Sequence, residues 1–404
     1  MPVIVQKYGG SSLSDIEKIK KVALLIANIK KEGYKVAVVV SAMGKTTDSL
    51  IESAKKLSHD PPGREIDMLL STGERISMSL LCIALNDLGV KAVSLTGSQA
   101  GVITNDRHTD ARVIEIRPFR IQDELEQGNV VVVGGFQGVS YKRDITTLGR
   151  GGSDTSAVAL AAALNAERCE IYSDIDGVYS ADPSIIKDAK HLPEISYQQM
   201  QEMSMAGAKV LNAQAVEYAK NAGITIYARS TFNPGKETIV RMLKPDAPSG
   251  VKSVVYENDV IKVFIKINHD ELKSLLNYFE EFNIQIKELN YIQTRANGSP
   301  GISFVISIKN IYGWEKRVND LKNMFGSRII FSENLSAVSL IGEGLNRDNK
   351  ILQSSIKLLD ENKIDYFGIT TTSFRISFLI NQQKLQSTLK LLHDKWVTLL
   401  PEAS

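Results

Sequence analysis

Two short runs of valine restrict the fold of this chain more than any other feature. Residues 36–40 and 130–133 are continuously apolar and lack the alternation of a strand with one solvated face. Such runs are typical of parallel strands that helices cover on both sides. Helical patterns, for example over residues 64–88, lie between them. The sequence therefore predicts an α/β domain with a mostly parallel central sheet, in which ligands gather at the carboxyl ends of the strands.

A glycine-rich turn precedes an alanine-rich helical run at residues 158–164. Its sequence is Gly149-Arg150-Gly151-Gly152-Ser153-Asp154. Glycine allows a tight turn and a close approach to a ligand, and the start of a helix favours bound anions. Arg150 can bind a carboxylate with two parallel hydrogen bonds, while Asp154 adds a negative charge on the same turn. The turn predicts a site for a small anionic molecule that also carries positive charge, or for a phosphate with its metal; a solvated turn is the alternative.

A second glycine turn follows the short strand expected at residues 3–5. Its sequence is Gln6-Lys7-Tyr8-Gly9-Gly10-Ser11-Ser12. An amphipathic run over residues 16–29 follows, and Ser14 and Glu17 have the spacing of a capping box. The backbone N–H groups of Gly9 and Gly10 can approach phosphate oxygens, with Lys7 offsetting their charge. The glycine spacing differs from that of a P-loop.

Composition excludes several classes of function. The net charge is +2 and the basic residues are dispersed, so the sequence indicates no basic patch of the kind that binds a nucleic acid. Cys82 and Cys169 form neither a disulfide framework nor a zinc-binding spacing, so we expect a reducing, cytoplasmic location. No apolar run reaches the roughly 18 residues that span a bilayer, and we expect no signal segment.

The composition changes after Met242. A Pro-, Gly- and Ser-containing stretch predicts a linker at residues 245–258, after a first domain at 1–244. Two β-α-β-β-α-β patterns follow in tandem, which predicts ferredoxin-like domains at 259–331 and 332–404.

The two glycine turns resemble signatures of the aspartate kinases, which belong to the amino-acid kinase superfamily. Three further stretches agree with that family: Ser71-Thr72-Gly73-Glu74-Arg75-Ile76-Ser77, the segment 173–183, and Gly207-Ala208-Lys209-Val210-Leu211. The resemblance runs from about residue 3 to residue 240 and includes five motifs in order. It implies a three-layer amino-acid kinase domain followed by two regulatory ACT domains.

The implied reaction is ATP-dependent phosphorylation of the side-chain carboxylate of L-aspartate to 4-phospho-L-aspartate. This is the first step toward lysine, threonine and methionine. A carboxylate is already ionised at pH 7, so the reaction needs alignment and charge stabilisation rather than a general base. The five histidines are scattered and are expected to be structural.

The resemblance implies a role for each charged residue of these motifs. Lys7 neutralises the transferred phosphoryl group, and Asp154 orients Lys7 or other groups of the site rather than taking a proton. Arg150 pairs with the α-carboxylate of the substrate and Glu74 with its α-ammonium, an arrangement that suits a zwitterionic amino acid. Further substrate contacts are expected at Ser41, Thr47, Gly151, Gly152 and Ser153.

Contacts with ATP are expected mainly in the segment 173–183. Tyr179 offers a flat face for adenine, and Asp174 offers an acceptor for its edge or for the ribose. The expected nucleotide contacts are Lys7, Gly9, Gly10, Ser173, Asp174, Tyr179, Asp182, Pro183 and Lys209. Mg²⁺ is required because it bridges phosphate oxygens, but no carboxylate cluster identifies its protein ligands.

The C-terminal modules depart from the family pattern. A Pro-Gly turn after the first strand is missing from both modules, which have Asn268-His269-Asp270-Glu271 and Gly344-Leu345-Asn346-Arg347-Asp348-Asn349 there. Leu289-Asn290 stands near the place of an expected Gln-Asn pair. Either the modules bind an effector other than the usual lysine or threonine, or they hold a homodimer or higher oligomer together without feedback inhibition.

Three other functions compete with this interpretation. A different amino-acid kinase, for acetylglutamate, glutamate or carbamate, would lack the tandem tail and the full Ser-Thr-Gly-Glu-Arg segment. A non-catalytic regulator would have no need for the charges of Lys7, Glu74, Arg150 and Asp154. A nucleotide-dependent oxidoreductase would require a strand–GxGxxG–helix unit, which is absent from the sequence.

Overall fold

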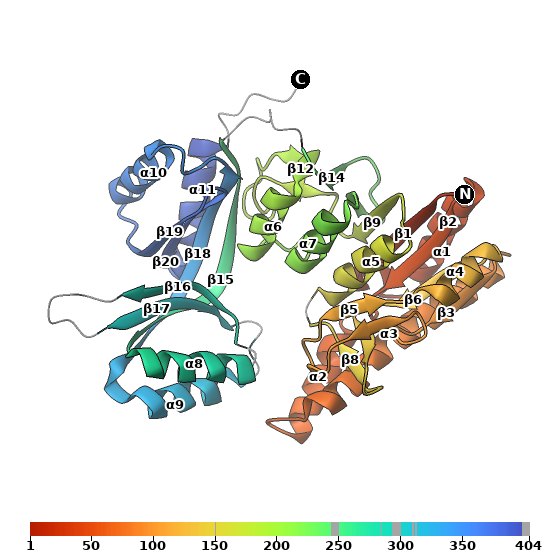
Figure 1. Cartoon of the computed structure of the whole chain (residues 1–404). Helices are drawn as coiled ribbons and strands as arrows, with labels where there is room; N and C mark the ends of the chain where they lie inside the picture. The colour runs from red at the N-terminus through yellow and green to blue at the C-terminus, as the bar shows by residue number, and fades with distance from the viewer. Residues whose placement is uncertain are drawn as a thin grey trace. The chain divides into compact units, whose positions relative to one another are not determined.

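The chain forms two compact units (Figure 1). The computed structural model describes residues 1–149, 151–243, 250–282, 284–292, 300–308, 311 and 313–397. Unit 1 comprises Met1–Val178, His191–Ser204 and Lys209–Ala247, and unit 2 comprises Tyr179–Lys190, Met205–Ala208 and Pro248–Ser404. The expected division of the chain thus needs one change, because two short segments of the first 244 residues belong to unit 2. Arg150 and residues 245–249 of the expected linker lie outside the described residues.

A mostly parallel sheet forms the centre of unit 1. Its strands are β1 (Val3–Tyr8), β2 (Lys35–Val40), β3 (Ala92–Leu95), β6 (Val130–Gly134), β9 (Arg168–Ser173), β12 (Glu194–Ser196), β13 (Ile226–Ser230) and β14 (Glu237–Arg241). The order is β12-β14-β13-β9-β1-β2-β6-β3, and only the pair β13–β14 is antiparallel among these strands. The valine runs form β2 and β6, which pair with each other and are buried, so the prediction for them is confirmed.

Helices cover both faces of this sheet. On one face, α1 (Ile16–Lys31) and α3 (Gly63–Asp87) bury their apolar side chains against alternate residues of β1, β2 and β6. On the other face, the alanine-rich α5 (Gly152–Ala163) lies against β1, β2 and β9. This is the expected three-layer arrangement. Asp15 caps α1 by accepting a hydrogen bond from the backbone N–H of Lys18, so the capping box expected at Ser14 and Glu17 is wrong.

The remaining elements of this part of the chain are short. A second sheet has the order β5-β4-β7-β8, with β4 (Val102–Thr104), β5 (Val113–Ile116), β7 (Gln137–Ser140) and β8 (Ile145–Thr147). The other elements are the 3-10 helix η1 (Gly10–Leu13), α2 (Thr46–Leu57), α4 (Phe119–Glu126), α6 (Tyr197–Met205), α7 (Ala213–Ala222) and the strands β10 (Val178–Tyr179) and β11 (His191–Leu192).

Helix α3 is long and apolar enough, by composition, to cross a membrane. In the structure it is a core helix of unit 1, because Met78, Leu81 and Leu85 pack into the cluster beneath the sheet. It also buries two carboxylates, Asp67 and Glu74, that contact polar groups of neighbouring segments. Its apolar character therefore follows from core packing.

Unit 2 contains one antiparallel sheet of six strands. Its strands are β15 (Gly250–Lys266), β16 (Ile286–Ile292), β17 (Gly301–Ser307), β18 (Ile329–Glu343), β19 (Tyr366–Thr371) and β20 (Arg375–Asn381), in the order β16-β17-β15-β18-β20-β19. Its helices are α8 (His269–Glu281), α9 (Trp314–Phe325), α10 (Lys350–Glu361) and α11 (Leu385–Trp396), with the 3-10 turns η3 (Gly326–Arg328) and η4 (Gln382–Lys384). Two separate apolar clusters show that the sheet serves two modules.

The two modules share the long strands β15 and β18, which corrects the expected tandem order. The first module runs from Val260 to the beginning of β18. The second begins in β18 and takes its last strand from the beginning of β15, where Val254 pairs with Leu340. Residues 250–257, expected to be linker, are therefore a core strand of the second module. A register shift between Glu257 and Val260, with Asp259 at φ 58°, separates the two parts of β15.

Substitution of Val254 distinguishes a core strand from a linker. Val254 is fully buried in the second module, so Val254→Ala should lower the free energy of unfolding by about 2 kcal/mol. Chemical denaturation of the whole chain measures this loss. Lys252→Ala, at a half-buried position of the same strand, should change it by less than about 0.5 kcal/mol. An equally small effect of both substitutions would contradict the shared-strand arrangement.

Candidate active site

The glycine turn after β1 lies at the carboxyl end of the central sheet. The N–H of Gly9 donates to the carbonyl oxygen of Tyr172 at the end of β9, and the carbonyl oxygen of Gly10 accepts from the N–H of Gly44. A side chain at Gly10 would place its Cβ 2.7 Å from the carbonyl oxygen of Ala42. The absence of a side chain therefore allows the loops after β1 and β2 to pack directly on each other.

Lys7 and Asp154 form an ion pair beside this turn. Lys7 Nζ lies 2.7 Å from Asp154 Oδ1, and the two side chains are only 11% and 10% exposed. Within the described residues, that oxygen makes no directed hydrogen bond, so the contact is chiefly ionic. A Cβ at Gly9 would lie 3.5 Å from Lys7 Nζ, which places the ammonium next to the backbone of the turn. A lysine held this way is a fixed positive charge, which can stabilise a bound anion.

Asp154 reaches this position because α5 begins in the second glycine turn. Gly151 precedes the helix with φ 74°, a conformation that favours glycine. A Cβ there would collide with the side chain of Asn212, so no other residue fits without rearrangement. Gly152 and Ser153 then form the first turn of α5, with Asp154. Arg150 itself lies outside the described residues.

Ser41 joins the end of β2 to this first turn. Its Oγ donates to the Oγ of Ser153 at 2.9 Å. Gly135, just after β6, also approaches Ser153, since a Cβ at Gly135 would lie 3.0 Å from the Cβ of Ser153. Thr47, in the first turn of α2, is half-buried. The carboxyl ends of β1, β2 and β6 thus meet the start of α5, as expected for ligand binding in a parallel sheet.

Glu74 brings a buried carboxylate to the loop after β2. It projects from α3 and is 2% exposed, and its Oε1 accepts the backbone N–H of Ala42 at 3.0 Å. Its Oε2 is buried and has no hydrogen-bond partner in the described part of the chain. Burial raises the pKa of Glu74 to about 7. Such a group is poised to take a cationic partner, because a buried carboxylate without one is costly to ionise.

The residues expected to bind the nucleotide are divided between the units. Ser173 ends β9, and its Oγ accepts the N–H of Ile175 at 3.1 Å. Asp174 and Lys209 belong to unit 1 and are exposed. Tyr179, Asp182 and Pro183 belong to unit 2, and Asp182 accepts hydrogen bonds there from Ser184 and from the hydroxyl of Tyr256. Their role in ATP binding stays a prediction.

Two features of this edge were missed from the sequence. Gly134 ends the valine strand β6 and Gly135 follows it, so this glycine pair resembles Gly9-Gly10 at the end of β1. A cavity of about 670 Å³ also lies between α1 and the segment after β13. Thr231, one of its lining residues, hydrogen-bonds Ser12 of the first glycine turn at 2.6 Å. No local pattern could reveal that contact, because it joins residues far apart in sequence.

The described residues hold no group of three or more histidine, cysteine, aspartate or glutamate side chains that could bind a metal ion. A magnesium ion that keeps several waters and binds mainly to phosphates needs no such cage.

Comparison with known proteins agrees with this geometry. Residues 2–230 match the model of the amino acid kinase family. The aspartokinase of Mycolicibacterium smegmatis is 41% identical over 404 residues, which cover 98% of this chain and 96% of that protein. The aspartokinase of Corynebacterium glutamicum is 38% identical over 408 residues, with 98% and 96% covered.

Solved structures show the same fold. Escherichia coli aspartokinase III in complex with aspartate and ADP (R-state) superposes with a TM-score of 0.81 at 22% identity, covering 97% of this chain and 99% of that one. The T-state structure of the same enzyme, with lysine and aspartate, gives a TM-score of 0.73 at 21% identity and the same coverage. Together with the sequence relatives, these findings show that the chain belongs to the amino acid kinase family, within its aspartokinases.

Proposed function

We propose that this chain transfers the γ-phosphoryl group of ATP to the side-chain carboxylate of L-aspartate, forming 4-phospho-L-aspartate and ADP. The observation that carries the proposal is that a buried ion pair and a buried carboxylate both lie at the carboxyl end of the central sheet. Lys7, held by Asp154, offers positive charge, and Glu74 offers a buried oxygen without a partner in the described residues. The names of the sequence relatives, and the aspartate and ADP bound to the E. coli enzyme, support the same substrates.

The chemistry requires no proton transfer. An oxygen of the ionised substrate carboxylate forms a bond to the γ-phosphorus, and the bond from that phosphorus to the β–γ bridging oxygen breaks. The bond's electron pair leaves with ADP. Lys7 neutralises charge on the transferred group, with the backbone N–H groups of the glycine turn as further donors. Asp154 fixes Lys7, a role that its 2.7 Å contact supports.

The substrate is recognised as a zwitterion. Glu74 pairs with the α-ammonium through its Oε2, and Arg150 pairs with the α-carboxylate. Ser41, Thr47 and the backbone and side chain of residues 151–153 complete the pocket. The hydrogen bond between Ser41 and Ser153 supports a shared surface, because it joins two of these segments.

Magnesium enters as the MgATP complex, and the nucleotide extends from the glycine turn toward Ser173 and Asp174. Lys209 is a further nucleotide contact in this proposal, and nucleotide contacts of Tyr179, Asp182 and Pro183 stay predictions from the sequence. The reaction would open the pathway to lysine, threonine and methionine in the cytoplasm. Both cysteines are free and buried, which agrees with a reducing location.

Unit 2 supplies assembly and regulation in this proposal. The edge strands β16 and β19 expose large apolar side chains, including Tyr291, Ile292 and Phe367, which supports a homodimer or higher oligomer through this unit. At the turn where an effector such as lysine or threonine would bind, Asn268 and Glu271 instead form a capping box at the N-terminus of α8. The backbone N–H of Glu271 is therefore occupied, which favours altered or lost feedback control.

Trapping with hydroxylamine tests the activity directly. Purified protein with MgATP and L-aspartate should form an aspartyl hydroxamate, while L-asparagine, which lacks the acceptor carboxylate, should form none. Absence of an aspartate-dependent product would contradict the proposal. Added lysine and threonine then test feedback control. A fall in rate with either amino acid shows an effector site that still binds it, and an unchanged rate favours a deregulated or differently regulated enzyme.

Lys7→Ala tests the phosphoryl contact. Loss of a fixed positive charge at the transferred group should lower kcat about 100-fold to 1,000-fold. Lys20→Ala removes an exposed lysine of α1 and serves as the matched control, with kcat expected unchanged. The hydroxamate assay measures both. Near-normal turnover of the Lys7 variant would remove this lysine from the mechanism.

Glu74 makes substrate binding depend on pH. Its raised pKa of about 7 means that the carboxyl is mostly protonated at pH 6 and mostly ionised at pH 8 in the free protein. If only the ionised form binds the α-ammonium, the KM for L-aspartate should be about tenfold higher at pH 6 than at pH 8. Glu74→Gln should raise the KM at pH 8 and remove this dependence.

Glu65→Gln is the control for that experiment, because Glu65 lies on the same helix but is exposed. It should keep the wild-type KM and its pH profile. A wild-type KM that is constant between pH 6 and pH 8, or a Glu74→Gln protein with unchanged KM, would show that Glu74 does not bind the ammonium.

A further inference from the structure

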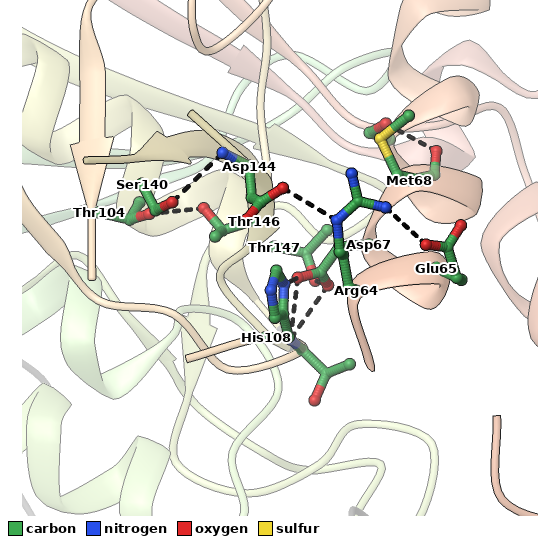
Figure 2. A network of polar contacts seen from close by, with 12 residues as sticks. Arg64, Glu65, Asp67, Met68, Thr104, His108, Ser140, Asp144, Thr146 and Thr147 are labelled. Atoms are coloured by element: carbon green, nitrogen blue, oxygen red, sulfur yellow. Dashed lines mark hydrogen bonds and ion pairs between the residues drawn. The ribbon is translucent and has the colours of Figure 1, made fainter. Parts of the chain in front are cut away.

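A second buried carboxylate on α3 ties together three segments of unit 1. Asp67 is fully buried. Its Oδ1 accepts the hydroxyl of Thr147 at 2.5 Å, and its Oδ2 lies 2.7 Å from Nδ1 of His108 (Figure 2). The backbone N–H of Thr109 donates to both oxygens, at 3.0 and 3.2 Å. One carboxylate thus connects α3 to the loop after β4 and to the end of β8.

The loop that Asp67 holds is strained. Thr109 has φ 67°, which is rare for a β-branched residue and costs energy unless the surroundings impose it. The hydrogen bonds from its N–H to Asp67 are a direct reason for this conformation. Burial raises the pKa of Asp67, and the hydrogen bonds from Thr147, His108 and Thr109 oppose that rise. The hydrogen bonds from these donors offset the cost of burying the Asp67 carboxylate.

The same loop contacts the turn that leads into α5. The N–H of Ala111 donates to the carbonyl oxygen of Thr147 at 2.8 Å. Gly149 has φ 73°, and a Cβ there would lie 2.8 Å from Oδ1 of Asp110. The carbonyl oxygen of Gly149 then accepts the N–H of Gly152, where α5 begins. Asp67 is therefore connected through short contacts to Thr147 and Gly149, on the N-terminal side of the turn that leads into α5.

Glu74 lies on the same helix, about two turns after Asp67. Each carboxylate binds a loop that borders the proposed aspartate pocket: Glu74 binds the loop after β2, and Asp67 binds the segment before residues 149–152. Helix α3 therefore holds two of the segments that border the proposed pocket.

We propose that Asp67 is a positioning residue for aspartate binding, which acts through Thr147 and the strained 108–111 loop to fix the described part of the turn that leads into α5, namely Gly149, Gly151 and Gly152. This inference rests on the proposed function, because it assigns that turn to the substrate. Loss of the hydrogen bond between Thr147 and Asp67 should therefore weaken the binding of L-aspartate and leave the binding of ATP unchanged. Displacement of a substrate-binding group by about 1 Å is enough to cost 10-fold to 100-fold.

Thr147 provides the sharpest test, because its two close replacements separate the hydroxyl from the side-chain volume. Thr147→Val keeps the shape but removes the donor to Asp67, and should raise the KM for L-aspartate about tenfold or more. Thr147→Ser keeps the donor and should stay within about twofold of wild type. The KM for ATP should stay within about twofold in both. Aspartate-dependent hydroxamate formation measures each constant, and the thermal midpoint reports stability.

Asp144→Asn is the matched control. Asp144 binds Nε of Arg64 at 2.9 Å, which connects the exposed beginning of α3 to the turn before β8 outside the Asp67 cluster (Figure 2). This variant should keep both KM values. If it raises the KM for L-aspartate as much as Thr147→Val does, general loosening between α3 and β8 is responsible, and the proposal is overturned.

Other outcomes are equally decisive. A lower thermal midpoint of Thr147→Val with an unchanged KM for L-aspartate would make the cluster purely structural. An equal rise in KM for L-aspartate and ATP would also contradict a role confined to the aspartate pocket. Asp67→Asn adds an independent measurement, since it keeps the volume but removes the charge, and it should act in the same direction as Thr147→Val. If the wild-type protein forms no hydroxamate, the proposed function fails, whereas an active wild type with an insensitive Thr147→Val contradicts this inference alone.

Discussion

Burial of β1, β2 and β6 on both faces is the constraint on which the candidate active site depends. Because helices cover both sides of these strands, polar groups can reach solvent or a ligand only where the strands end. The turns after β1, β2 and β6 therefore gather at one edge. Glycines at positions 10 and 135 let these turns pack closely against neighbouring backbone and side chains. The apolar sheet thus determines where the chemistry is located.

The charged side chains at that edge differ in whether they have a partner within the structure. Lys7 and Asp154 come from a strand and from the first turn of a helix, and they compensate each other in a largely buried setting. Glu74 lacks such a partner in the described residues, and burial raises its pKa to about 7. Asp67, on the same helix, is by contrast fully engaged with internal donors. A single helix therefore carries one buried carboxylate whose Oε2 has no hydrogen-bond partner in the described residues and one that bonds to the surrounding loops.

Unit 2 uses long strands to make two modules inseparable. Strands β15 and β18 each cross from one module to the other, so neither module has a complete sheet without the other. The two modules are therefore joined by continuous backbone. The first module closes the turn before α8 with a capping box at Asn268, and neither module has the Pro-Gly turn of the family pattern.

The sequence by itself determined the fold class, the two glycine turns and the family, because these depend on local patterns: valine runs, glycines after strands and ordered motifs. It also indicated the charged residues Lys7, Glu74 and Asp154, since each belongs to such a motif. Only the tertiary structure decided that residues 250–257 complete the second module, because that pairing joins Val254 to Leu340 across the whole first module. It alone placed Tyr179 and Asp182 in unit 2 and connected Asp67 to Thr147. Contacts between distant segments depend on how strands and helices pack, and no local pattern in this chain encodes them.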